Sequence, residues 1–190
     1  MSLENLARVG QLVEHMTNKE QVAKLLEAAA RFIQDARSET ISKETRFNAA
    51  YKAVIQYSMV ALYGNGYRPA KNRPGHHQTM IQSLVHSISL NNDERLLLDT
   101  FRVKRNAADY TGELLDDGSV VECIDAAVRL QRHLYSWLKE NRPDLLDLIL
   151  VSKRPYLSKP RLISALHNTR APFRARNRQH KNNNNRDLAL

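Results

Sequence analysis

The stretch KEQVAKLLEAAARFIQDARS, residues 19–38, decides the fold class of this chain. Its apolar side chains recur at intervals of three and four residues: Val22, Leu25, Leu26, Ala29, Phe32, Ile33 and Ala36. This spacing places them on one stripe of an α-helix, whereas a half-buried strand requires strict alternation. We therefore predict an amphipathic helix over residues 19–38.

The flanking sequence predicts more helices, because glycine and proline are absent from residues 11–63, 76–111 and 119–142 and good helix formers fill these windows. A second helix should open at Ser42 and stop at the Gly64–Gly66 turn. Its predicted apolar stripe consists of Phe47, Ala50, Tyr51, Val54, Ser58, Ala61 and Leu62. A third should span residues 76–90, and a fourth should run from a cap at Asn91–Asp93 to about residue 109. No alternation of period two is long enough to predict a sheet.

The fifth predicted helix follows the turn at residues 116–118 and continues to Asn141. Ser119 and Glu122 match a capping box at its start. The side chains predicted on its inner side are Val121, Ile124, Val128, Tyr135 and Leu138. Short helices are also predicted near residues 3–15 and 145–150, and residues 67–75 should form a loop.

These elements predict an all-α protein, an antiparallel four- to five-helix bundle over residues 1–152. The remaining residues, 153–190, contain three prolines, four consecutive asparagines and few apolar side chains, which is typical of a flexible tail.

The charge is unevenly distributed along the chain. Residues 1–150 carry 19 Lys and Arg against 19 Asp and Glu, so the net charge of +9 comes from residues 151–190. A neutral body with a polycationic arm is the arrangement expected of a protein that binds a polyanion. The alternative is that the basic terminus only improves solubility.

Several features of the sequence limit the class of protein to which this chain can belong. A single cysteine, Cys123, cannot form an internal disulfide, and the N-terminus lacks the pattern of a signal peptide. No apolar run reaches the roughly 20 residues that span a membrane. We expect a soluble, cytoplasmic protein without a membrane partner. Gly-rich phosphate loops, paired cysteines and HExxH are also absent, so we expect no metal and no cofactor.

An arginine interrupts the apolar stripe of the fourth helix. Leu98, Phe101, Arg105 and Ala108 fall on one side of this helix. A guanidinium there is costly to bury unless it is paired or faces a groove. Asp109, four residues later, is within reach of an ion pair. Arg105 is therefore either a functional cation or half of a structural ion pair that ties two helices together.

The string Arg105-Asn106-Ala107-Ala108-Asp109-Tyr110 resembles the signature of the HEPN superfamily of small helical domains. Three other segments fit the same resemblance, which covers about residues 15–145: 46–51, 66–69 and 75–77. It implies a dimeric, metal-independent ribonuclease of toxin–antitoxin or phage-defence systems, with RNA as substrate and an antitoxin as a possible protein partner.

The resemblance also implies roles for individual residues. Arg105 matches the family arginine, which would stabilise phosphate charge in the transition state, and Asn106 matches the polar residue that often follows it. Tyr110 stands where the family has a histidine. A phenol is a poor base at neutral pH, but it could donate a proton or hydrogen bond to phosphate, or stack on a base. The alternative is a tyrosine packed at the helix end.

His76 and His77 are the other candidate catalytic residues. They follow a basic loop at the start of the third helix, where backbone amides attract anions and favour neutral imidazole. The alternative is that one caps the helix and the other packs inward. The cations and the amide predicted to contact nucleic acid are Arg68, Lys71, Arg73, Arg102, Lys104, Asn106, Arg170, Arg174, Arg176 and Arg178.

Three functional hypotheses remain open at this point. The first is a dimeric ribonuclease with Arg105 and His76 or His77 in its active site. The second is a helical module that binds RNA, a nucleotide or a protein without cleavage and is anchored by its basic tail. The third is a partner of a nucleotidyltransferase antitoxin that is modified on tyrosine.

Overall fold

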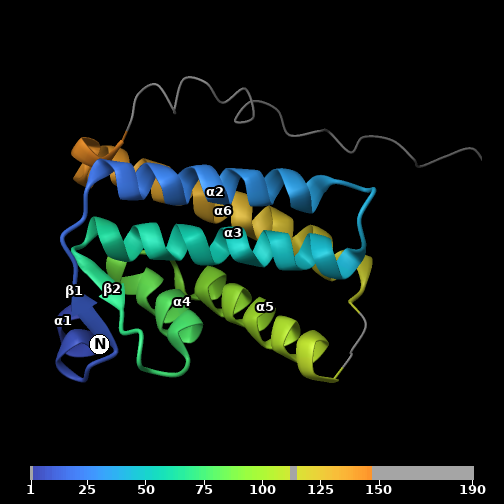
Figure 1. Ribbon diagram of the computed structural model, residues 1–190, viewed down its shortest axis with the longest axis horizontal. Helices are drawn as coiled ribbons and strands as arrows, with labels where there is room; N and C mark the ends of the chain where they lie inside the picture. Colours follow the sequence, from blue (N-terminus) through green and yellow to red (C-terminus); the bar gives the residue numbers. More distant parts are fainter. Residues whose placement is uncertain (1, 112–114, 147–190) are drawn as a thin grey trace, which may run out of the picture. The chain divides into compact units, whose positions relative to one another are not determined.

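A computed structural model describes residues 2–111 and 115–146, all of which belong to one compact unit of the chain. Its elements, labelled in Figure 1 where space allows, are α1 (Leu3–Arg8), β1 (Leu12–Glu14), α2 (Lys19–Arg37), α3 (Lys43–Gly64), β2 (Tyr67–Pro69), α4 (His76–Ser87), α5 (Asn92–Thr111), α6 (Asp117–Asn141) and the 3-10 turn η1 (Pro143–Leu145). The predicted all-α class is confirmed for this part of the chain, apart from one short sheet. None of its helices is both long and apolar enough to cross a membrane.

Helix α3 forms the centre of the core. It packs against α2, α4, α5 and α6 (Figure 1), and side chains on all its sides are buried, including Phe47, Tyr51, Tyr57 and Leu62. The other long helices are amphipathic and turn one face toward it. A helix that is apolar all round is a buried one. The prediction of a single apolar stripe on this helix was therefore too narrow.

The helix starts that were predicted from capping residues are largely confirmed. Ser42 is the N-cap of α3, and its hydroxyl accepts a hydrogen bond from the amide of Thr45. Asn91 accepts the amide of Glu94 at the start of α5. Helix α2 begins at Lys19 as predicted, with Asn18 and Gln21 forming a capping box. Such caps satisfy amides that have no partner within the helix.

The predicted start of α6 was wrong. Asp116, not Ser119, is the N-cap, because its carboxylate accepts both the amide and the hydroxyl of Ser119. The predicted inner face also needs correction. Val121 is 53% exposed, whereas its neighbour Val120 is buried. Ile124 and Leu138 are buried as predicted.

A two-stranded antiparallel sheet replaces part of two predicted segments, the helix near residues 3–15 and the loop at 67–75. Helix α1 ends at Arg8, and Gly10 then turns the chain at a φ of 72° into β1. In the sheet, Leu12 lies opposite Pro69 and Glu14 opposite Tyr67. Strands of three residues are too short to show an alternating pattern in the sequence.

Two further predictions differ from the structure or lie beyond it. Helix α4 ends at Ser87, before the predicted residue 90, and Ser89 follows with a φ of 55°. Of the helix predicted near residues 145–150, the structure describes only residues 145 and 146, where Leu145 ends the 3-10 turn η1, and residues 147–150 lie outside the described residues. The predicted tail, residues 153–190, lies outside the described residues.

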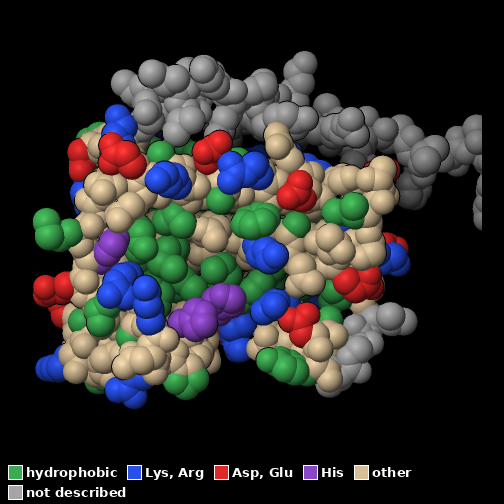
Figure 2. Space-filling model, in the orientation of Figure 1, with side chains coloured by type: hydrophobic (Ala, Val, Ile, Leu, Met, Phe, Trp, Pro, Cys, Tyr) green, Lys and Arg blue, Asp and Glu red, His purple; other side chains and the backbone are tan. Residues whose placement is uncertain are grey.

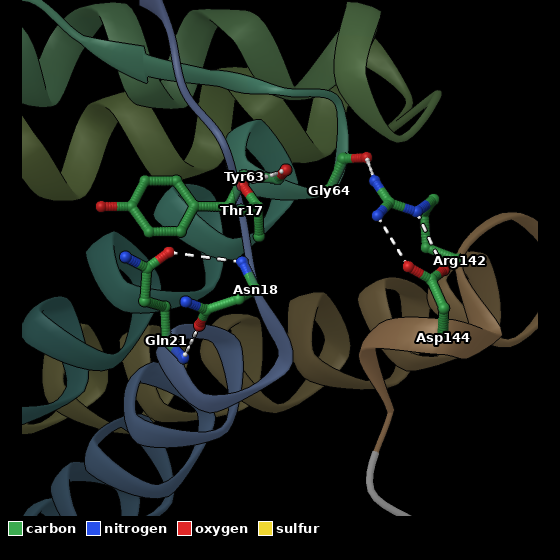
Figure 3. Close-up of polar contacts among 7 residues, drawn as sticks. All are labelled: Thr17, Asn18, Gln21, Tyr63, Gly64, Arg142 and Asp144. Atoms are coloured by element: carbon green, nitrogen blue, oxygen red, sulfur yellow. Dashed lines mark hydrogen bonds and ion pairs between the residues drawn. The ribbon is translucent and has the colours of Figure 1, made fainter.

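Two side chains close the C-terminal end of α3, where backbone carbonyls have no partner within the helix. The Thr17 hydroxyl donates to the carbonyl of Tyr63 at 2.8 Å, and the Arg142 guanidinium donates to the carbonyl of Gly64 at 2.7 Å (Figure 3). Arg142 is held in turn by Asp144 at 2.8 Å. A cation at this position also interacts favourably with the helix dipole. The contacts fix the end of α3 to the segments before α2 and after α6.

Candidate functional site

Helices α3, α4 and α5 bring polar side chains together where α4 and α5 pack against α3. We call this group the Arg–His cluster, and its members are Asn48, Tyr51, His76, His77, Arg102, Arg105 and Asp109. Figure 2 shows histidine side chains beside Lys and Arg side chains over the region where α4 and α5 lie in Figure 1. The sequence predicted four of these residues as site residues, from two separate segments.

Tyr51 is the buried centre of the cluster, with 2% of its surface exposed. Its hydroxyl oxygen lies 3.2 Å from Nδ1 of His77, within hydrogen-bonding distance. Its ring lies below the Arg105 guanidinium, with 5.7 Å from Cζ to the ring centroid. Burial raises the pKa of Tyr51 to about 12, and the nearby Arg105 only partly offsets this. The phenol is therefore protonated at neutral pH.

His77 is held as a neutral imidazole. Burial is the largest cause, and the neighbouring charges of His76, Arg105 and Arg102 act in the same direction, so that the pKa falls to about 4. His76 is exposed, and its ring centroid lies 4.7 Å from that of His77. The pair begins α4 directly after Gly75, so both imidazoles lie at the N-terminus of this helix.

Arg105 connects α5 to α3. Its guanidinium pairs with Asp109 at 2.8 Å, and the two side chains are 33% and 36% exposed. Its Nε donates a hydrogen bond to the side-chain oxygen of Asn48 at 3.4 Å. The ion pair anticipated from the sequence is thus present, but it lies within α5 and does not tie two helices together. The contacts to Asn48 and Tyr51 do.

Arg102 also has a carboxylate partner. Its Nε donates to Asp99 at 2.6 Å, one turn earlier in α5, and the side chain is 20% exposed. The two arginines of the Arg–His cluster are therefore each matched by an aspartate of the same helix. An incoming anion has to compete with carboxylates for both guanidinium groups.

Other predicted residues of α5 lie apart from these contacts. Tyr110 is 87% exposed. It follows Arg105 by five residues, a spacing that turns two side chains to different faces of a helix. Lys104 points toward α6, where its ammonium donates to the Ser119 hydroxyl at 2.7 Å. Asn106 is half-buried. Neither the tyrosine nor the lysine shares the surface on which Arg105 meets Tyr51.

The predicted basic loop leads into the cluster along the chain. Arg68 belongs to β2 and is half-buried, whereas Lys71 and Arg73 are exposed. The Arg73 guanidinium lies against Gly10 of the N-terminal turn. The predicted tail contacts Arg170, Arg174, Arg176 and Arg178 lie outside the described residues.

Sequence reasoning did not single out Asn48 and Tyr51 as site residues. Both lie in the helix predicted after Ser42, and Tyr51 is part of its apolar stripe, where a tyrosine is ordinarily a core residue. Only the packing of α3 against α4 and α5 shows that its hydroxyl meets His77. Within the 46–51 segment, the polar Asn48 was the one local signal.

Among the residues described, no group of three or more His, Cys, Asp and Glu side chains is arranged to hold a metal ion. The comparisons with known proteins give no further identification, because no protein-family model and no curated protein matches this chain. The geometry of the Arg–His cluster and the sequence motifs are therefore the features from which a function can be inferred.

Proposed function

We propose that this protein is a HEPN-like, RNA-directed protein that cleaves RNA without a metal ion, and that the Arg–His cluster is its active site. The observation that supports this most is that His77 of α4 and Arg105 of α5 both contact the buried Tyr51 of α3, with His76 beside His77. Transesterification of RNA requires a base for the ribose 2′-hydroxyl and a cation for the charge on phosphate, and an imidazole and a guanidinium can supply them.

The chemistry assigns a task to each type of group. A neutral histidine takes the proton of the ribose 2′-hydroxyl, whose oxygen then attacks the adjacent phosphorus. The bond from phosphorus to the 5′-oxygen breaks, and that oxygen takes a proton from solvent. Arg105 stabilises the negative charge that develops on the non-bridging oxygens.

The ion pair with Asp109 does not prevent this role. Both side chains are about one-third exposed, and exposed pairs contribute only about 0.2–1 kcal/mol. A phosphate, which binds an arginine in a bidentate manner, can displace a carboxylate held so weakly. Asp109 then occupies the phosphate-binding position of Arg105 until the substrate displaces it.

The test is cleavage of a single-stranded RNA in excess EDTA by the full chain. Arg105→Ala should abolish cleavage, whereas Arg95→Ala, a change of the same type at the start of α5, should leave it intact. Arg95 is a suitable control because ten residues, about 15 Å of helix, separate it from Arg105. Equal loss in both variants, or cleavage that requires added metal, would exclude the proposal.

A second candidate function is binding of RNA without cleavage. Two observations favour it: Tyr110 occupies the place of the family histidine and is turned away from the Tyr51 contacts, and both arginines are already paired. In this case the basic residues 153–190 supply much of the affinity. Binding should then weaken steeply with salt, and deletion of residues 153–190 should abolish most of it.

The resemblance also extends the proposal to biological context, as a toxin or phage-defence protein that acts as a homodimer beside an antitoxin. Tyr110, 87% exposed, is the tyrosine we propose for modification by a nucleotidyltransferase partner. Co-expression with the adjacent gene and intact-mass measurement tests this. An added nucleotide mass that disappears in Tyr110→Phe supports it, and an unchanged mass excludes it.

A further inference from the structure

The Tyr51 hydroxyl can donate one hydrogen bond, and its acceptor in the structure is a ring nitrogen of His77. A buried hydroxyl without a hydrogen-bond partner loses its solvation without compensation, so buried phenols are generally satisfied. Tyr51 is 2% exposed, and among the described residues its hydroxyl has a single hydrogen-bond partner, Nδ1 of His77. The simplest way to satisfy both atoms is for the phenol to donate and Nδ1 to accept.

This direction of donation fixes the protonation of the imidazole. A neutral histidine carries one N–H and one bare nitrogen. When Nδ1 accepts from Tyr51, the ring proton must be on Nε2. Burial keeps the ring neutral, since the pKa of His77 is about 4. His77 then offers a hydrogen-bond donor, and not a base, to whatever binds at its other nitrogen.

We propose that Tyr51 is the positioning residue of the Arg–His cluster, that it holds His77 as the Nε2–H tautomer, and that His76 is consequently the general base. This inference rests on the proposed ribonuclease function. His76 is exposed and lies beside His77, with 4.7 Å between the ring centroids. One phosphodiester group can therefore contact both imidazoles.

The same tyrosine positions the cation. The centroid of its ring lies 5.7 Å from the Arg105 Cζ, and a guanidinium over an aromatic ring is attracted by the ring's negative face. One buried side chain thus orients two groups from two other helices. His77 Nε2–H and Arg105 donate to the non-bridging oxygens, while His76 receives the 2′-hydroxyl proton.

The direct test is nitrogen-15 NMR of the full chain, which distinguishes a protonated from a bare ring nitrogen. His77, assigned by the loss of its signals in His77→Gln, should show protonated Nε2 and bare Nδ1 at pH 7. In Tyr51→Phe, which keeps the ring, this preference should be lost. Tyr67→Phe, a change of the same type in β2, should leave it unchanged. A wild-type His77 protonated at Nδ1, or a tautomer unaffected by Tyr51→Phe, overturns the proposal.

Kinetics in EDTA test whether His76 is the base and His77 the hydrogen-bond donor. His76→Gln should lower kcat by about 100-fold or more, the usual loss when a general base is removed, and should abolish the acidic limb of the pH profile. Tyr51→Phe should lower kcat with little change in KM. An unchanged pH profile in His76→Gln overturns the assignment of the base. Because the NMR measurement needs no activity, a failure of the ribonuclease proposal is distinguishable from a failure of the role of Tyr51.

Discussion

Replacing Asp109 with asparagine should strengthen the binding of RNA. The substitution removes the carboxylate that competes with phosphate for Arg105 and also removes one negative charge from the site. The Arg105–Asp109 pair is 2.8 Å long between side chains that are 33% and 36% exposed. Exposed pairs contribute about 0.2–1 kcal/mol, and 1.4 kcal/mol corresponds to a tenfold change in affinity. The dissociation constant should therefore fall by up to about fivefold.

The assay is fluorescence anisotropy with a labelled single-stranded RNA at low salt and in EDTA. Its control is Asp93→Asn, which changes the net charge by the same amount in the first turn of α5, about 24 Å along the helix from residue 109. Since long-range electrostatics affects both variants, only the difference between them reports on the site. Equal affinities in the two variants, or weaker binding by Asp109→Asn, would refute the role given to Arg105.

Three further predictions concern stability. Burial lowers the pKa of His77 to about 4, below the value of about 6.5 in the unfolded chain, so the unfolded chain binds more protons between these values. The free energy of unfolding should therefore reach its full value above pH 6.5 and fall toward pH 4. The two pKa values correspond to about 3 kcal/mol, and because the ring is only half-buried and solvent screens it, we expect a loss of about 2 kcal/mol. Urea titrations of wild type and His77→Gln should show this difference, and parallel pH profiles would contradict it. Arg142→Ala removes the donor to the Gly64 carbonyl and should lower the free energy of unfolding, measured in urea, by about 1–2 kcal/mol. An unchanged urea midpoint would show that solvent replaces the contact. Gly64→Ala would place a Cβ 2.8 Å from the Trp137 ring and should lower the free energy of unfolding by about 1 kcal/mol, although alanine has the better helix propensity. The fluorescence emission of this single tryptophan should shift as well. A higher stability would mean that the Trp137 ring moves aside without cost.

The sequence was sufficient for the helices whose signals are local. The stripe in residues 19–38 and the caps at Ser42 and Asn91 all act within one or two turns, and the structure confirms them. The start of α6 was misjudged because Asp116 and Ser119 are both good capping residues, and only the observed hydrogen bonds show that the aspartate serves. The predicted inner face was wrong at one position, because Val121 is exposed, whereas Ile124 and Leu138 are buried as predicted.

The parts that could not be predicted depend on contacts between distant segments. Strands β1 and β2 pair residues more than fifty positions apart over three residues each, which is too short for a pattern. The site shows the same limit. Arg105 was identifiable because a cation in an apolar stripe is a local anomaly. Tyr51 was not, because its position in α3 resembles that of any core aromatic residue and its hydroxyl acquires a role only when α4 packs against it.

Where RNA binds is the central question, and side-chain NMR answers it most directly. The full chain, labelled with nitrogen-15, is titrated in EDTA with a short RNA whose 2′-hydroxyls are methylated, so that it binds but cannot be cleaved. The proposed site predicts that the Arg105 Nε–H and the imidazole of His77 shift together and saturate with the RNA, while the Arg95 Nε–H does not move. Saturable binding that leaves Arg105 and His77 unperturbed would place the RNA elsewhere and contradict the proposed active site.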